Sequence, residues 1–250
     1  MIKSKKRNIK IKLEYDGTEF AGWQVQPEMR TVQGSVETSL NKLTGEKIRV
    51  IGAGRTDAGV HAKGQVAHFS TSTRLTENTL LRGINALLPK DVVVLSAEEV
   101  TDTFHARFSA VKKTYCYSVW TAKISSPLHR RITFHYPHVL SITEMQKAAA
   151  VLVGSHDFAS FASNRGKPEA STVREIMRFD IIKADSLLRL IIEADGFLYK
   201  MVRRLAGTII EVGRGKISME ELKDILMKAN RKYGGPNLPP HGLCLEKVVY

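Results

Sequence analysis

The sequence contains few cysteines and no long apolar segment. Cys116 and Cys244 are the only two cysteines among 250 residues, and they lie far apart. Such a pair forms neither a zinc-binding pattern nor a disulfide framework. There is no run of about 18 apolar residues and no signal-peptide core, and the basic start leads directly into an alternating segment. We therefore expect a cytoplasmic, metal-free protein.

Common catalytic motifs are also missing. There is no Ser/His/Asp order, no HExxH, no Walker phosphate loop and no paired-carboxylate spacing. His61 and His68 have no nearby cysteine and no third histidine, so a structural or substrate hydrogen bond is favoured over metal ligation. The stretch 213–215, Gly-Arg-Gly, resembles a phosphate loop weakly and is better interpreted as a helix end.

Positive charge is plentiful. Lys and Arg number 38 against 25 Asp and Glu, which gives a formal net charge of +13. Such a surplus attracts polyanions. Arginine and aromatic residues occur together at Arg107, Phe108, Tyr199 and Arg203, a combination typical of nucleic-acid sites. A merely basic protein and a membrane-surface protein are the alternatives.

The first half of the chain predicts the order strand, helix, strand, strand, helix, strand. Residues 9–15 alternate between apolar and charged side chains, which indicates a strand with one buried face. Thr31 can cap a helix that Gly45 ends. A second helix carries Leu80, Leu81, Ile84, Leu87 and Leu88 on one face and stops at Pro89, and the apolar run 92–95 predicts a buried strand.

The second half predicts the same order with an additional helix. Ser141 with Glu144 and Ser218 with Glu221 have the spacing of helix capping boxes. The expected strands span about 111–120, 173–183, 187–194 and 243–250, and a helix is expected at about 198–212. The fold class is therefore α+β, with two tandem βαββαβ (ferredoxin-like) units whose antiparallel sheets flank a basic central cleft. The expected domains are 1–105, which carries the loop described next, and 106–250, which contributes the rest of the cleft.

One stretch organises these elements. Residues 54–62, Gly-Arg-Thr-Asp-Ala-Gly-Val-His-Ala, connect two short apolar runs, and we call them the signature loop. Its glycines allow a close backbone approach to a ligand. It presents one carboxylate, Asp57, beside one guanidinium, Arg55. A single carboxylate with an arginine partner suits covalent attack or proton abstraction at a sugar or base.

The signature loop and the following 64–69 resemble the TruA family of tRNA pseudouridine synthases. Further stretches match that family in order along the chain from about residue 8 to residue 250. They are 15–18 (YDGT), 20–24 (FAGWQ), 31–34 (TVQG), 85–89 (NALLP), 104–110 (FHARFSA), 154–158 (GSHDF), 196–203 (GFLYKMVR) and 242–245 (GLCL). The resemblance implies the pseudouridine synthase fold and an enzyme without a cofactor.

The resemblance also implies roles for individual residues. Asp57 corresponds to the family aspartate that breaks the bond between ribose C1′ and uracil N1, as a nucleophile or as a base. Arg203 resembles the arginine that pairs with this aspartate. Tyr115 corresponds to the tyrosine that stacks on the target uracil, and the neighbouring Tyr117 has a packing role. Leu243 or Leu245 is expected to form an apolar wall against the uracil, and Arg55 to contact the vacated stem or a phosphate.

The family implies a substrate and a partner too. The expected reaction is isomerisation of uridine to pseudouridine at positions 38 to 40, in the anticodon stem-loop of tRNA, by a homodimer. Two other readings stay open. Charge and tandem βαββαβ units would suffice for a non-catalytic RNA-binding module, and a metal-dependent nuclease would need a carboxylate cluster that is missing here.

Two regions differ from the family pattern or add to it. Leu238 and His241 stand where small or acidic residues are common in relatives, which could alter the rim that meets RNA. Residues 163–172 are expected to form a flexible loop and a candidate RNA clamp.

Overall fold

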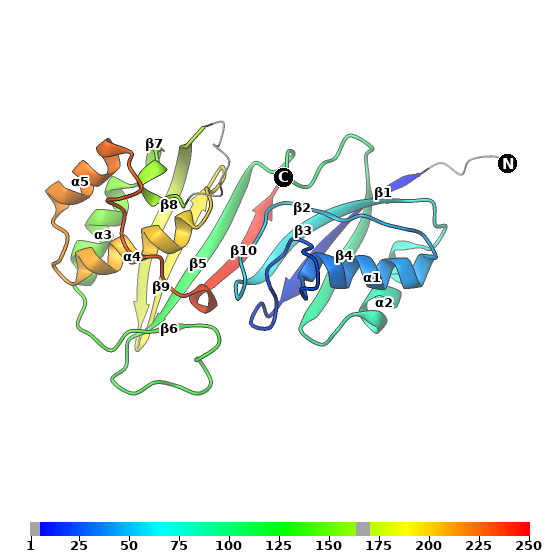
Figure 1. Ribbon diagram of the computed structural model, residues 1–250, viewed down its shortest axis with the longest axis horizontal. Helices are drawn as coiled ribbons and strands as arrows, with labels where there is room; N and C mark the ends of the chain where they lie inside the picture. The colour runs from blue at the N-terminus through cyan, green and yellow to red at the C-terminus, as the bar shows by residue number, and fades with distance from the viewer. Residues whose placement is uncertain (1–5, 164–170) are drawn as a thin grey trace. The chain divides into compact units, whose positions relative to one another are not determined.

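The computed structural model describes residues 6–163 and 171–250 (Figure 1). The chain divides into two compact units, Met1–Val111 with Leu245–Tyr250, and Lys112–Cys244. Both units are α+β, as the sequence predicts, and the strand pairs within each are mostly antiparallel. Most of the expected clamp segment, 164–170, lies outside the described residues.

The sheet of the first unit is built around β1. The strands follow the order β4, β1, β3, β10, and β2 pairs with β3. Ile9, Ile11 and Leu13 are fully buried, so the predicted one-sided strand is confirmed. The strands span β1 (Arg7–Tyr15), β2 (Ile51–Gly52), β3 (His61–Thr71), β4 (Val92–Val100) and β10 (Leu243–Val249).

Two helices cover one face of this sheet (Figure 1). They are α1 (Val32–Thr44) and α2 (Glu77–Leu87). Thr31 caps α1 by accepting a hydrogen bond from the Gly34 amide, and Gly45 ends the helix in the left-handed region, both as predicted. The observed order β1, α1, β2, β3, α2, β4 is the predicted one.

Two expectations about burial in the first unit are wrong. The run 92–95 is not buried throughout, because Val93 and Leu95 are exposed on β4 while Val92 and Val94 are buried. β4 is the edge strand of this sheet, and its side chains alternate between the helix side and the opposite face. Leu87, at the end of α2, is also exposed.

The sheet of the second unit follows the order β5, β9, β8, β7, and β6 pairs with β5. All of these pairs are antiparallel except β5 with β6. Asp185 takes a positive φ of 51° in the predicted turn between β8 and β9. The strands span β5 (Lys112–Trp120), β6 (Phe134–His135), β7 (Gly154–Asp157), β8 (Val173–Ala184) and β9 (Leu187–Ala194). The sequence did not predict β6 and β7.

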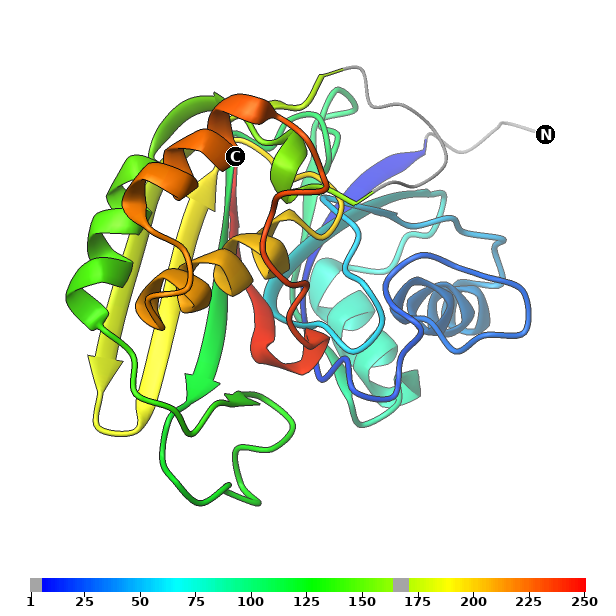
Figure 2. The same cartoon turned by 60° about the vertical axis from the view of Figure 1, so that its left-hand side comes forward.

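Three helices lie on one face of the strands of the second unit (Figure 2). They are α3 (Ile142–Val151), α4 (Met201–Gly213) and α5 (Met219–Lys228). The Ser218–Glu221 capping box is complete and confirms its prediction. For α3 the Ser141 side chain accepts from the Glu144 amide, while the Glu144 carboxylate lies 2.9 Å from Lys147 Nζ. The two short 3-10 helices are Ala159–Phe161 and Pro240–Gly242.

The described part of the chain contains no helix long and apolar enough to cross a membrane. Within those same residues no cluster of three His, Cys, Asp or Glu side chains is arranged to hold a metal ion. Cys116 and Cys244 are not joined to each other in a disulfide bond.

Candidate active site

The signature loop joins β2 to β3, as predicted. Asp57 opens a tight turn in which its carbonyl accepts a hydrogen bond from the Val60 amide at 3.1 Å, and Gly59 takes a φ of +76° within that turn. Asp57 is partly exposed and Arg55 is exposed. The carboxylate is therefore carried by an irregular segment between two strands, where functional side chains often lie.

The backbone around Asp57 is tied to the rest of its unit by buried groups. The Trp23 amide donates to the Thr56 carbonyl at 3.0 Å, and the hydroxyls of Tyr15 and Thr56 share a hydrogen bond of 2.8 Å. Gln65 Nε2 donates to the Gly54 carbonyl at 3.0 Å. The residues on either side of Asp57 thus have fixed positions, which holds the carboxylate in place.

Two glycines let the segment 15–24 approach the signature loop closely. A Cβ on Gly22 would lie 2.7 Å from the Thr56 carbonyl oxygen, and Gly22 has a φ of +100°. A Cβ on Gly17 would collide with the carbonyl of Val60. Because only glycine fits at such distances, the backbones of the two segments pack directly against each other.

Both histidines of β3 have structural hydrogen bonds. His61 Nδ1 lies 3.1 Å from the Gly17 amide nitrogen and 3.1 Å from Asp16 Oδ1. His68 Nδ1 accepts from the Ala106 amide at 3.1 Å. Burial, with a smaller effect of the nearby His105, lowers the pKa of His68. These contacts agree with the expectation of a structural hydrogen bond at this pair.

Tyr115 and Tyr117 face the same side of β5 but have different surroundings. The Tyr115 ring meets Phe197 edge to face, with centroids 5.1 Å apart. Tyr117 is fully buried, and its hydroxyl donates to the Pro239 carbonyl at 2.9 Å. Burial raises the pKa of Tyr117 far above its ordinary value. Its phenol therefore stays neutral and serves as a structural donor, in keeping with the predicted packing role.

Arg203 lies in the first turn of α4, after Lys200 with a φ of +62°. It is buried, and its Nε donates to the Leu238 carbonyl at 2.7 Å. Arg203 and Tyr117 therefore hold two successive backbone carbonyls, those of Leu238 and Pro239, in the segment that precedes β10. Leu238, which is expected from the sequence to depart from the family pattern, is itself buried.

The predicted site residues are divided between the two units. Asp57, Arg55 and Leu245 belong to the first, and Tyr115, Arg203 and Leu243 to the second. Leu243 and Leu245 are both buried on β10. The pairing of Asp57 with Arg203 and the shared uracil pocket stay predictions.

The groups that hold the signature loop were not singled out in the sequence. Tyr15, Thr56 and Gln65 form a buried polar cluster beneath it. Gln65 is the clearest signal that was available, because a fully buried amide in an apolar strand needs hydrogen-bond partners.

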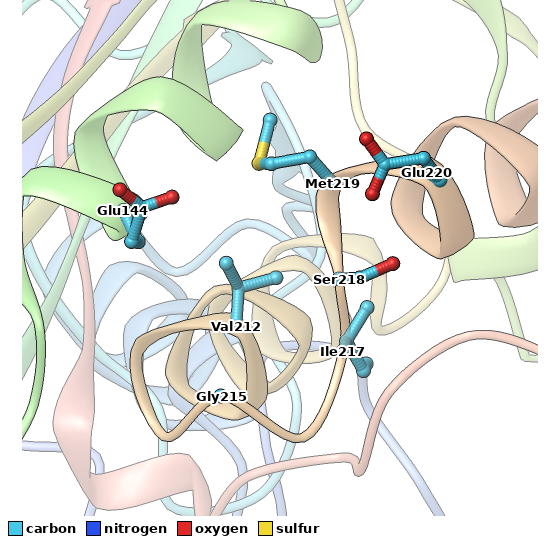
Figure 3. Close-up of a pocket in the computed structure, with 7 residues that line it drawn as sticks. All are labelled: Glu144, Val212, Gly215, Ile217, Ser218, Met219 and Glu220. Carbon is cyan, nitrogen blue, oxygen red and sulfur yellow. The ribbon is translucent and has the colours of Figure 1, made fainter.

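A hollow of about 370 Å³ lies elsewhere in the second unit (Figure 3). Val212, Ile217 and Met219 line it together with the carboxylates of Glu144 and Glu220. It contains none of the predicted site residues. Two carboxylates also repel a polyanion, so it is a poor RNA site.

Comparison with known proteins covers nearly the whole chain. The family model described as tRNA pseudouridine synthase matches residues 12–109 and 148–250. A tRNA pseudouridine synthase A of Thermoanaerobacter sp. (strain X514) is 44% identical over 244 residues, which are 98% of this chain and 100% of the relative. The tRNA pseudouridine synthase A 2 of Clostridium perfringens is 41% identical over 244 residues, with the same coverage of both chains.

Among solved structures, a chain of an H/ACA RNP bound to a substrate RNA aligns with a TM-score of 0.31 and 11% identity, over 81% of this chain and 53% of that chain. At that score the likeness supports no conclusion about the fold. The family model and the full-length relatives are sufficient, and they show that the chain belongs to the tRNA pseudouridine synthase family.

Proposed function

We propose that this chain isomerises uridine to pseudouridine at positions 38 to 40 in the anticodon stem-loop of tRNA, with Asp57 as the catalytic group. The observation that carries the proposal is the position of Asp57. It is the only carboxylate of the signature loop, and hydrogen bonds to the neighbouring Thr56 and Gly54 fix that loop. A reaction that depends on one side chain requires this kind of restraint.

The reaction needs a carboxylate next to the ribose. The bond from ribose C1′ to uracil N1 breaks, the base turns, and C5 bonds to C1′. N1 gains a proton and C5 loses one, so atoms balance without an oxidant or reductant. Asp57 acts either by attacking C1′ as a nucleophile or by removing the 2′ proton to form a glycal. Both routes need the ionised carboxylate.

The remaining site residues complete the proposal. Tyr115 stacks on the target uracil, Arg203 pairs with Asp57, and Leu243 or Leu245 forms the apolar wall. Arg55 contacts the stem or a phosphate after the base leaves its stack. The buried position of Arg203 on α4 supports this role, because an ordered guanidinium can orient a carboxylate through charge-assisted hydrogen bonds.

The wider architecture follows the same proposal. The domains 1–105 and 106–250 act as two ferredoxin-like βαββαβ units, and their sheets flank a basic cleft that receives the RNA. The net charge of +13 supports binding of a polyanion. The enzyme acts as a homodimer in the cytoplasm.

The direct test is tritium release from tRNA labelled at uracil C5. Asp57→Asn should reduce release by at least about a thousandfold, because the variant cannot act as nucleophile or base. Its tRNA affinity should stay within about tenfold, since phosphate contacts dominate binding. Asp185→Asn is the matched control. It removes the same charge at an exposed turn where asparagine tolerates the positive φ.

The same assay separates the alternatives. Release that depends on Asp57 and persists in excess EDTA supports the synthase. Binding without release from the native chain would favour the non-catalytic RNA-binding module. No tritium release, together with cleavage of the transcript that stops in excess EDTA, would favour the nuclease.

A further inference from the structure

The turn 104–109, between β4 and β5, carries an aromatic ring into solvent. Phe108 is 75% exposed, and Arg107 beside it is also exposed. A large aromatic ring in water costs free energy that burial would recover. Its exposure therefore calls for an explanation if the turn is held in a single conformation.

Hydrogen bonds hold this turn in one conformation. The Ser109 amide donates to the His105 carbonyl at 2.8 Å, and the His105 amide donates to Ser109 Oγ at 3.0 Å. His105 Nδ1 lies 3.2 Å from the amide nitrogens of Arg107 and Phe108, which donate to it. Phe108 is thus exposed on an ordered turn.

The turn is also anchored to two other strands of the first unit, β3 and β10, through His68 and Tyr250, which follows β10. The Ala106 amide donates to His68 Nδ1, and the Ala106 carbonyl accepts from the Tyr250 hydroxyl at 2.8 Å. Burial raises the pKa of Tyr250, so its phenol stays protonated as a donor. The exposed ring is therefore presented on a rigid base.

Phe108 ends a short series of rings in contact. Its ring stacks on His105 with centroids 4.4 Å apart and planes 28° apart. His105 in turn meets His68 at 4.8 Å. The Arg107 guanidinium lies 5.4 Å from the centroid of the Phe108 ring. An exposed ring beside a guanidinium combines a stacking surface with a positive charge, the two groups on which nucleic acid bases stack.

We propose that Phe108 and Arg107 form a stacking platform for an unpaired base of the tRNA substrate, other than the uridine that reacts. This inference rests on the proposed function for the identity of the RNA. RNA is favoured over a second copy of the chain because the neighbour of Phe108 is a cation and the whole protein carries a charge of +13. The contact is independent of base identity, since every base has a face that can stack.

The contacts described for Phe108 and Arg107 are with His105 and with each other, and not with the groups that hold the signature loop. Those groups are Tyr15, Trp23, Thr56 and Gln65. Substitution at Phe108 should therefore change tRNA binding while leaving the chemistry at Asp57 intact.

The test pairs Phe108→Ala with Phe108→Trp and uses an unmodified tRNA transcript as the probe. Phe108→Ala should weaken tRNA binding by about tenfold, because loss of one base stack removes a contact of that size. KM in the tritium assay should rise while kcat stays the same. The salt dependence of binding should keep its slope, since no phosphate contact is lost. The tryptophan of Phe108→Trp should be quenched when tRNA is added.

Met227 gives the matched control, because it is 74% exposed on α5. Met227→Ala should bind tRNA like the native chain, and Met227→Trp should show no quenching beyond that of the native chain, which already contains Trp23 and Trp120. Thermal unfolding of each variant checks that the fold is retained.

Three results would overturn the platform. They are tRNA binding by Phe108→Ala within about twofold of native, equal quenching of both tryptophan variants, and a change in sedimentation of Phe108→Ala with unchanged tRNA affinity, which would mark a protein interface. Failure of the proposed function has another signature, the absence of tritium release from the native chain. Quenching of Phe108→Trp by tRNA would still support an RNA platform in that case.

Discussion

Asp57 and Arg203 are held in opposite ways. Asp57 lies on an irregular loop whose position depends on hydrogen bonds from the backbone and from buried side chains of other residues, and on glycines that permit close approach. Arg203 lies on α4, and its own buried side chain holds a neighbouring segment through the Leu238 carbonyl. In the first unit the surrounding residues position the proposed catalytic side chain, and in the second unit a proposed site side chain positions the backbone around it.

This difference determines which substitutions each region tolerates. Where a loop packs against another backbone, replacing a glycine by a larger residue displaces the loop, even though no site side chain changes. Where a side chain holds a segment through a hydrogen bond, truncating that side chain destabilises the segment, because a buried carbonyl then lacks its donor. The predictions below test this contrast, beginning with the largest effect.

Gly22→Ala should lower kcat by about a hundredfold, since a misplacement of about 1 Å near a reacting group has an effect of that size. The added Cβ would lie 2.7 Å from the Thr56 carbonyl oxygen, so the signature loop and the segment 15–24 must move apart to relieve that contact. Single-turnover tritium release measures the effect.

Gly45→Ala separates the effect of backbone strain at a positive φ from the effect of displacing the signature loop. Gly45 also has a positive φ, +71°, but an added Cβ would meet nothing within 4 Å. This variant should lose about 1 kcal/mol of stability and keep its activity. Equal loss of activity in both variants would show that backbone contact with the loop is not what positions Asp57.

The two tyrosines of β5 test the second unit. Tyr115→Leu keeps apolar bulk but removes the ring, so kcat/KM should fall by about tenfold or more with the loss of one base stack. Tyr117→Phe removes only the hydroxyl that donates to Pro239. It should lower the free energy of unfolding by about 1 kcal/mol and leave kcat/KM within about threefold. The reverse pattern would exchange the roles assigned to the two residues.

Local sequence patterns were sufficient for most elements. The alternation in β1, the Thr31 cap of α1 and the capping box of α5 each depend on neighbouring residues, and each was predicted. The two-residue β6 is too short to show any periodicity. Exposure on β4 was missed because an apolar run does not show that one face of its strand is open to solvent.

Long-range contacts account for the remainder. The hydrogen bond between Tyr15 and Thr56 joins residues 41 positions apart, and no local pattern signals it. The last strand was predicted, but its periodicity does not tell which sheet it joins. Leu245–Tyr250 belong to the first compact unit. The site residues themselves came from the family resemblance, whereas the groups that hold the loop required the structure.

The smallest predicted effect is a loss of stability at acidic pH, and it is expected in the first unit but not in the second. His61 and His68 are buried in the first unit, whereas the buried polar residues described in the second include no histidine. The pKa of His68 is lowered mainly by burial, so the unfolded chain binds a proton more readily than the folded one. Stability should therefore fall as the pH drops through about 6.5, the ordinary value for histidine.

Native-state hydrogen exchange, corrected for intrinsic rates, should show protection falling in β1 and β3 but not in β8 and β9 between pH 7.5 and 5.5. His68→Gln, which offers an acceptor that does not titrate, should reduce this pH dependence. An equal loss of protection in both units would instead assign the acid response to groups shared by the whole chain.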